Sequence, residues 1–178
     1  MKKALTIILL FSVFAVSLFA DSFRFSIVWE NTVASESLLS VVNTTDDNSI
    51  STKPLSLTVD EQPVARIKYT TNEGGTHKLI YKATPLKTDS DDTGYAFILK
   101  FYYPDSSAQP ATINVGKNKN LTYPNGSLEN SAYTDLPMGN SGSMNTEYVS
   151  MTVQMYELAI MPIDKQYTST ITIVRQSV

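Results

Sequence analysis

Strict alternation of apolar and polar residues is the feature that most restricts what this chain can fold into. The clearest case runs from residue 95 to residue 103, where one face carries Tyr95, Phe97, Leu99, Phe101 and Tyr103. Successive side chains of a β-strand point to opposite faces, so this period of two predicts a strand that buries one face. No segment after residue 20 combines helix caps with a period of 3.6 residues, and the sequence therefore predicts an all-β fold.

The same alternation predicts further strands at 22–29, 55–59, 64–70, 76–84, 149–158 and 167–174, and a short apolar run before a polar turn predicts one at 37–42. Residues 72–75 (NEGG) are typical of a tight turn, because paired glycines supply positive φ angles, so we expect the strands on either side to pair as a hairpin. Strands with one apolar face bury it when two sheets pack face to face. The sequence therefore predicts an Ig-like antiparallel β-sandwich of about 7–9 strands.

The longest apolar faces predict which strands form the core. They belong to segments 95–103, 149–158 and 167–174. Burying them together removes the most apolar surface from water, so we expect Phe97, Leu99 and Phe101 to pack against the other two segments.

Residues 105–146 differ from the rest of the chain because they contain few apolar residues and many turn-forming ones. A short strand at 112–115 is expected, and another at 121–123 is a weaker expectation. The remainder predicts a long polar loop region.

The first 20 residues have the pattern of a secretory signal peptide. Lys2 and Lys3 precede an apolar run from residue 4 to Ala20, after which the sequence turns polar. We expect cleavage after Ala20, with cleavage after Ser17 as the alternative, and a single domain over residues 21–178. The protein is then exported to the periplasm, the cell surface or the medium, and is not an integral helical membrane protein.

Composition excludes several classes of site. The chain has no cysteine and a single histidine, which rules out disulfide frameworks, thiol nucleophiles and cysteine-ligated zinc. Loss of Lys2 and Lys3 with the signal segment lowers the net charge from −3 to −5, which argues against nucleic-acid binding. No catalytic motif surrounds His77, which we expect to be exposed on a strand. The sequence therefore predicts a non-enzymatic protein without a cofactor.

Clustered aspartates suggest one metal hypothesis. Asp89, Asp91 and Asp92 lie in a polar segment that ends in a glycine, and carboxylates in such a loop suit calcium. The triplet 92–94 (DTG) also occurs in aspartic proteases, but it follows a solvated turn here and not an apolar strand. An exposed acidic loop remains the simpler interpretation of both patterns.

The last segment carries a resemblance to a known group. Residues 167–174 (YTSTITIV) follow a polar turn, 164–166 (DKQ). This pattern resembles the closing strand of fimbrial-type secreted β-sandwich proteins, including pilin-like and spore-coat-U-like proteins. Gln166 stands where many of that group have glycine, and their usual cysteines are absent. The resemblance implies an Ig-like sandwich and assembly by strand exchange.

Two sets of residues are candidates for interaction surfaces. An apolar stripe directly after the signal segment could add as a strand to another subunit, although pairing within its own domain is the preferred interpretation. Exposed tyrosines of the polar region could bind carbohydrate or protein. The stripe is Phe23, Phe25, Ile27 and Trp29, and the tyrosines are Tyr102, Tyr103, Tyr123 and Tyr133.

Together these patterns favour an exported, non-enzymatic β-sandwich with a structural, adhesive or pilus-like role, and partners that are protein subunits or carbohydrate. The first alternative is an extracytoplasmic module that binds sugar or calcium. The second is a small outer-membrane β-barrel, although several predicted strands are short for spanning a bilayer.

Overall fold

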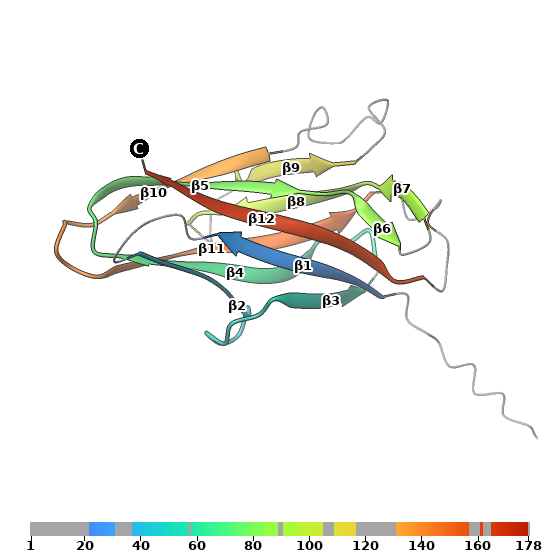
Figure 1. The fold of residues 1–178 in the computed structure, drawn as a ribbon, viewed down its shortest axis with the longest axis horizontal. Helices are drawn as coiled ribbons and strands as arrows, with labels where there is room; N and C mark the ends of the chain where they lie inside the picture. The colour runs from blue at the N-terminus through green and yellow to red at the C-terminus, as the bar shows by residue number, and fades with distance from the viewer. Residues whose placement is uncertain are drawn as a thin grey trace, which may run out of the picture.

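Twelve strands form the described part of the chain, and no helix occurs there (Figure 1). The computed structural model describes residues 22–30, 37–56, 58–88, 91–104, 109–116, 131–156, 161 and 165–177. The strands are β1 (Ser22–Glu30), β2 (Ser37–Val42), β3 (Thr52–Ser56), β4 (Gln62–Thr71), β5 (Gly75–Ala83), β6 (Leu86–Thr88), β7 (Asp91–Tyr95), β8 (Phe97–Tyr102), β9 (Ala111–Val115), β10 (Ser131–Met138), β11 (Asn145–Met155) and β12 (Tyr167–Ser177). The predicted signal peptide lies outside the described residues.

The strands form two sheets, as a β-sandwich requires. The first sheet has the order β10-β5-β12-β1-β3, and β6 joins it by pairing with β12 and with β7. The second has the order β2-β4-β11-β8-β9. Neighbouring strands are antiparallel except β1 and β12, which are parallel. Figure 1 shows β5, β12, β1 and β3 side by side in this order.

The core prediction is confirmed. The three named residues of β8 are fully buried, and so are Val149 and Val153 of β11 and Ile171 and Ile173 of β12, all in one cluster. The two sheets meet where Tyr81 of β5 stacks on Phe101 of β8, with ring centroids 3.7 Å apart. Burial of these apolar faces supplies the main driving force for folding.

The predicted hairpin is wrong. β4 lies between β2 and β11 in the second sheet, whereas β5 lies between β10 and β12 in the first. Residues 72–74 therefore carry the chain from one sheet to the other, and we call this turn the first arch. Gly75 has φ +95°, so the glycine pair supplies the expected turn geometry. A turn of this composition, between strands with one apolar face, suits an arch as well as a hairpin.

Segment 95–103 is not a single strand. The chain passes from β7, which pairs with β6, to β8, which pairs with β11 and β9, and Ala96 separates the two. β7 also occupies part of the segment 88–94 that composition predicts to be loop. The change of partners explains why one continuous alternation corresponds to two strands.

The polar region 105–146 contains more structure than its composition predicts. β9 confirms the expected strand at 112–115, but β10 was not predicted, and residues 121–123 lie outside the description. β10 ends the order of its sheet and buries only Leu136 and Met138. Because so few of its side chains enter the core, its sequence reads as a loop. Short or edge strands of this kind bring the total above the predicted 7–9. The strand predicted at 55–59 lies earlier, as β3, and Val59 follows it and is 58% exposed.

β1 is held in the first sheet from both sides. It runs parallel to β12 from the pair Phe23 and Tyr167 to the pair Glu30 and Val174, and antiparallel to β3 over residues 22–26. The backbone therefore pairs within its own chain, as the preferred interpretation of this segment expects. The side chains of residues 22–30 lie outside the description.

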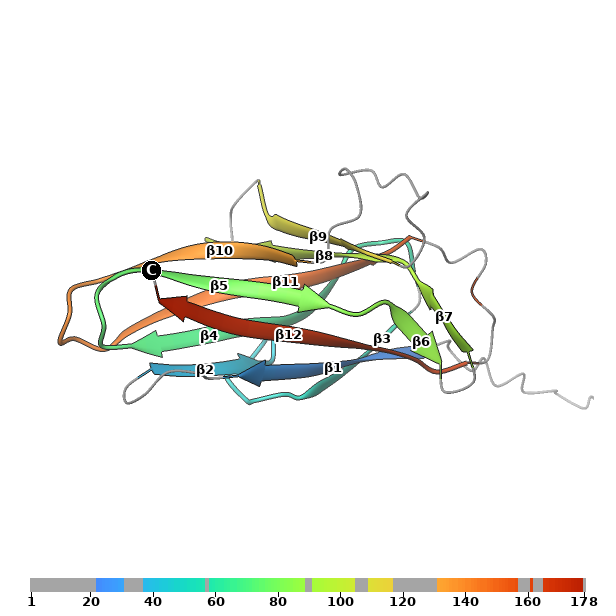
Figure 2. The same cartoon turned by 45° about the horizontal axis from the view of Figure 1, so that its top comes forward.

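Two turns that connect the sheets lie at the same end of the sandwich. There β4 turns into β5, and β10 turns into β11 through residues 139–144, the second arch. Figures 1 and 2 show that the C-terminal end of β12 lies at the same end. Among the described residues, no helix is long and apolar enough to cross a membrane.

Candidate functional site

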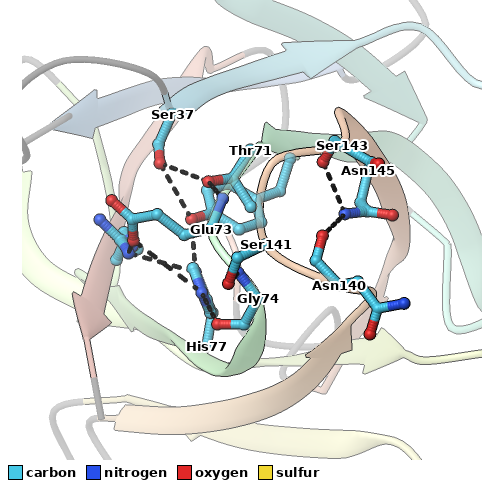
Figure 3. Close-up of polar contacts among 11 residues, drawn as sticks. Ser37, Thr71, Glu73, Gly74, His77, Asn140, Ser141, Ser143 and Asn145 are labelled. Atoms are coloured by element: carbon cyan, nitrogen blue, oxygen red, sulfur yellow. Dashed lines mark hydrogen bonds and ion pairs between the residues drawn. The ribbon is translucent and has the colours of Figure 1, made fainter.

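A buried group of polar side chains lies beside the two arches (Figure 3). Members come from β2, β4, the first arch, β5 and β12, so strands of both sheets meet here. We call it the arch cluster, and its residues are Ser37, Tyr69, Thr71, Glu73, His77 and Arg175. All except Glu73 are buried.

The two arches bind each other directly. The N–H of Gly142 donates to the carbonyl of Asn72 at 2.8 Å, and the N–H of Gly74 donates to Oγ of Ser141 at 3.2 Å. A Cβ atom at Gly74 would lie only 2.7 Å from the backbone N of Ser141. Glycine is therefore required for this close approach, and any other residue there would separate the arches.

His77 lies at the centre of the arch cluster and is 4% exposed, so the expectation of an exposed histidine is wrong. Its Nδ1 is 2.6 Å from the hydroxyl oxygen of Tyr69 and 3.2 Å from Nη2 of Arg175. A guanidinium can only donate, so Nδ1 accepts and the ring proton is on Nε2. Nε2 then faces the carbonyl oxygen of Gly74 at 3.4 Å.

Arg175 is the least expected member, because its side chain is 1% exposed. Its Nη2 pairs with the carboxylate of Glu73, while Nε and Nη1 have no hydrogen-bond partner in the described structure. A buried cation with so few partners is costly unless its carboxylate is present. The pair therefore joins the end of β12 to the first arch.

The geometry of the arch cluster does not resemble that of a hydrolase. The hydroxyl of Ser37 bonds to Thr71 at 2.8 Å, and the atoms nearest to Nδ1 of His77 belong to Tyr69 and Arg175. None of the described contacts places a serine hydroxyl on the imidazole. What this arrangement can do is hold strand ends of both sheets together.

A second set of polar contacts lies on the exposed face of the second sheet. Asp47, from the loop between β2 and β3, accepts hydrogen bonds from Arg66 at 3.1 Å, Lys68 at 2.7 Å and Tyr148 at 2.8 Å. We call these four residues the Asp47 cluster. The hydrogen bonds from Lys68 and Tyr148 hold the pKa of Asp47 below its ordinary value.

A similar group lies farther along the same face. Glu61, from the loop between β3 and β4, accepts hydrogen bonds from Lys100, from Tyr102 at 2.8 Å and from Thr152 at 2.6 Å. We call these residues the Glu61 cluster. Burial alone would raise the pKa of Glu61, but the three hydrogen bonds outweigh it and the pKa lies below its ordinary value. Burial, with the Glu61 carboxylate, raises the pKa of Tyr102 to about 12.

The predicted tyrosines do not gather on one surface. Tyr102 belongs to the Glu61 cluster, whereas Tyr133 is 55% exposed on β10 of the other sheet, with Nζ of Lys78 4.3 Å from its ring centre. Tyr103 is half-buried, and burial, with the nearby Glu147, raises its pKa. Tyr123 lies outside the described residues.

The other predicted site residues are only partly described. The backbone of the stripe Phe23, Phe25, Ile27 and Trp29 lies in β1, and its side chains are not described. Of the calcium candidates, Asp91 and Asp92 lie in β7 with undescribed side chains, and Asp89 is outside the description. Elsewhere in the described structure, no group of three histidine or acidic side chains could hold a metal ion. The calcium hypothesis therefore stays a prediction.

Sequence reasoning missed the arch cluster, although two signals pointed to it. His77 has the same phase as Leu79 and Tyr81, and Arg175 has the same phase as Ile171 and Ile173. Polar residues that continue an apolar phase are expected to point into the core.

A comparison with protein-family models finds no match to this chain, and a comparison with curated proteins finds none either.

Proposed function

We propose that this protein is an exported, non-enzymatic, Ig-like β-sandwich with a structural or adhesive role, and that copies associate by exchanging β1. The pairing of β1 supports this most directly. Eight of its residues pair with β12, and on its other side it pairs with β3. A strand at this position in one copy can be replaced by the same strand of another copy, because the backbone hydrogen bonds are identical.

The place of β1 in the sequence also supports the proposal. It directly follows the segment with the signal-peptide pattern, so export and cleavage would make it the N-terminal arm of the mature protein. Loss of β1 would leave β12 with an unpaired edge in the middle of the first sheet, and such edges readily accept another strand. The resemblance of the last strand to fimbrial-type proteins agrees with this mode of assembly.

Engineered disulfides would test the exchange, since the chain has no cysteine of its own. Ser26 and Thr170 are register partners on β1 and β12, so the double variant Ser26→Cys with Thr170→Cys places two thiols on neighbouring strands. The Cα atoms of adjacent strands lie within the usual range for a disulfide. Exchange predicts disulfide-linked dimers and longer chains when the concentrated protein is oxidised, and a mixed dimer when the two single variants are combined.

A matched pair on neighbouring interior strands provides the control. Thr172 and Lys82 are register partners on β12 and β5, and Thr172→Cys with Lys82→Cys should always give a disulfide within one chain. If the disulfide of the variant Ser26→Cys with Thr170→Cys also forms only within single chains at every concentration, the exchange proposal is refuted.

A second candidate function is carbohydrate binding on the exposed face of the second sheet. The observation in its favour is that Tyr102 and Tyr148 lie there beside fixed carboxylates and cations, groups that can bond sugar hydroxyls. A glycan array probed with wild type, Tyr102→Ala and Tyr133→Ala would test it. Loss of a signal only with Tyr102→Ala supports binding at this face, and no signal with wild type refutes it.

A further inference from the structure

The only histidine of the chain is buried in the arch cluster, at the point where the end of β12 meets the first arch. We propose that the arch cluster is an acid-sensitive contact, in which protonation of His77 separates the C-terminal end of β12 from the first arch. This goes beyond the proposed function, because it concerns a conformational response of the single chain and requires no exchange of β1.

The hydrogen bonds around the imidazole carry the argument. Nδ1 of His77 is an acceptor, because Nη2 of Arg175 lies 3.2 Å away and a guanidinium nitrogen can only donate a hydrogen bond. The hydroxyl of Tyr69 lies 2.6 Å from the same nitrogen. A proton on Nδ1 could be accepted by the hydroxyl oxygen of Tyr69 but not by the guanidinium of Arg175, so protonation of the ring removes the acceptor of Arg175 and breaks that contact.

The charged groups that face His77 also disfavour a charged ring. β12 contributes Arg175, the first arch contributes Glu73, and the neighbouring residues of β2 and β4 contribute only the uncharged side chains of Ser37 and Tyr69. Glu73 is the one group that favours a charged ring, with Oε2 4.0 Å from Nε2, but its carboxylate already pairs with Arg175. Protonation would leave two cations and one carboxylate in a buried space, which is unfavourable.

The expected change is local. Near its end β12 pairs with β5, with Arg175 opposite Leu79 and Ser177 opposite His77. Movement of Arg175 away from a charged ring would break its pair with Glu73 and loosen these last register pairs. The rest of β12 is held by buried Ile171 and Ile173 and would stay in place.

Proton NMR can follow the event directly, since a single histidine gives a single set of imidazole signals. We expect that residues 174–177 and 76–79 lose protection from hydrogen exchange at the pH at which the imidazole signals change, once the intrinsic pH dependence of amide exchange is removed. The protection of β8 and β11 should not change. A change in the imidazole signals without a loss of protection at the end of β12 would overturn the proposal.

The variant His77→Asn separates the histidine from other acid effects. An asparagine oxygen can accept near the position of Nδ1 but cannot gain a proton in this range. We expect the melting temperature of wild type to fall by about 2–4 °C more than that of His77→Asn between pH 7 and pH 5. Glu61→Gln, on the exposed face, should keep the wild-type acid response.

Two outcomes contradict the proposal in this comparison. Equal acid responses in wild type and His77→Asn would show that other groups cause the change. An acid response that is retained in His77→Asn and lost in Glu73→Gln would assign the change to the carboxylate. If either variant fails to fold, the wild-type titration and exchange experiment alone decides.

Discussion

The arch cluster and the Asp47 cluster share three kinds of side chain, yet their arginines lie in opposite environments. Each pairs a carboxylate with an arginine and includes a tyrosine, which bonds Asp47 in one cluster and His77 in the other. In the arch cluster the side chain of Arg175 is 1% exposed, whereas in the Asp47 cluster those of Arg66 and Asp47 are 26% and 43% exposed. Water can replace a lost partner on the exposed face but not beside Arg175, so burial rather than the number of contacts sets the energetic value of each cluster.

The two regions also differ in what they connect. The arch cluster joins residues of β2, β4, β5 and β12, and therefore both sheets. The Asp47 and Glu61 clusters attach loop residues to the exposed face of one sheet. Damage to the arch cluster should therefore affect global stability, whereas damage to an exposed cluster should release only a loop.

The largest expected effect is that of Glu73→Gln, which leaves Arg175 buried without its carboxylate. Breaking a buried pair from one side typically costs about 3–5 kcal/mol, and because Glu73 is 43% exposed we expect about 2–3 kcal/mol. Urea unfolding monitored by fluorescence would measure the loss. Asp47→Asn is the matched control and should change the midpoint far less, and equal losses would contradict the comparison.

A smaller effect is expected from Tyr69→Phe, which removes the hydroxyl 2.6 Å from Nδ1 of His77 and keeps the ring. Loss of a buried hydrogen bond that leaves its partner less satisfied costs about 1–1.5 kcal/mol. Thermal melting would detect it as a lower melting temperature. The matched variant Tyr102→Phe removes a hydroxyl from the Glu61 cluster and should cost less, and the reverse order would contradict the role of burial.

The sequence predicted the exposed face of the second sheet better than the arch cluster. Alternation over the predicted strand 64–70 puts Arg66 and Lys68 on one face and Tyr69 on the other, and the structure agrees, because the period of two depends only on local backbone geometry. Asp47, the partner of Arg66 and Lys68, could not be predicted, and neither could Glu61 in the other exposed cluster, since both belong to loops whose paths depend on the whole fold. The same limit applies to the first arch, because turn composition does not state which sheet the next strand joins.

The buried polar residues were harder to predict for a different reason. Phase alone places His77 and Arg175 inward, but ordinary burial preferences place an arginine at the surface and a histidine between surface and core. The structure follows phase, because Glu73 and Tyr69 supply partners that cannot be recognised before the arch is formed. Phase is therefore the stronger signal where a charged residue continues an apolar face.

On the exposed face, Glu61→Gln is expected to cost about 1 kcal/mol or less, since exposed ion pairs are weak. The variant keeps a hydrogen-bond acceptor for Tyr102 and Thr152, so mainly the charge interaction with Lys100 is lost. Thermal melting at low and high salt would measure it. The difference from wild type should shrink at high salt, because exposed charges are screened. A difference that is unaffected by salt would indicate a buried pair.

The smallest effect is the pH dependence of this same difference, and its direction follows from the lowered pKa of Glu61. A carboxyl group whose folded pKa lies below its unfolded value stabilises the protein above the unfolded pKa, and that contribution is lost as the pH falls through the folded pKa. The ordinary value for Glu61 is 4.5. The difference in melting temperature between wild type and Glu61→Gln should therefore be constant from about pH 8 to about pH 6 and should disappear gradually below about pH 4.5. This loss lies below the range from about pH 7 to about pH 5 in which wild type and His77→Asn are compared, so a pH series of both variants separates the two regions of the molecule. A difference that disappears already between pH 7 and pH 5 would mean that Glu61 does not respond as an exposed carboxylate, and the contrast between the two regions would then fail.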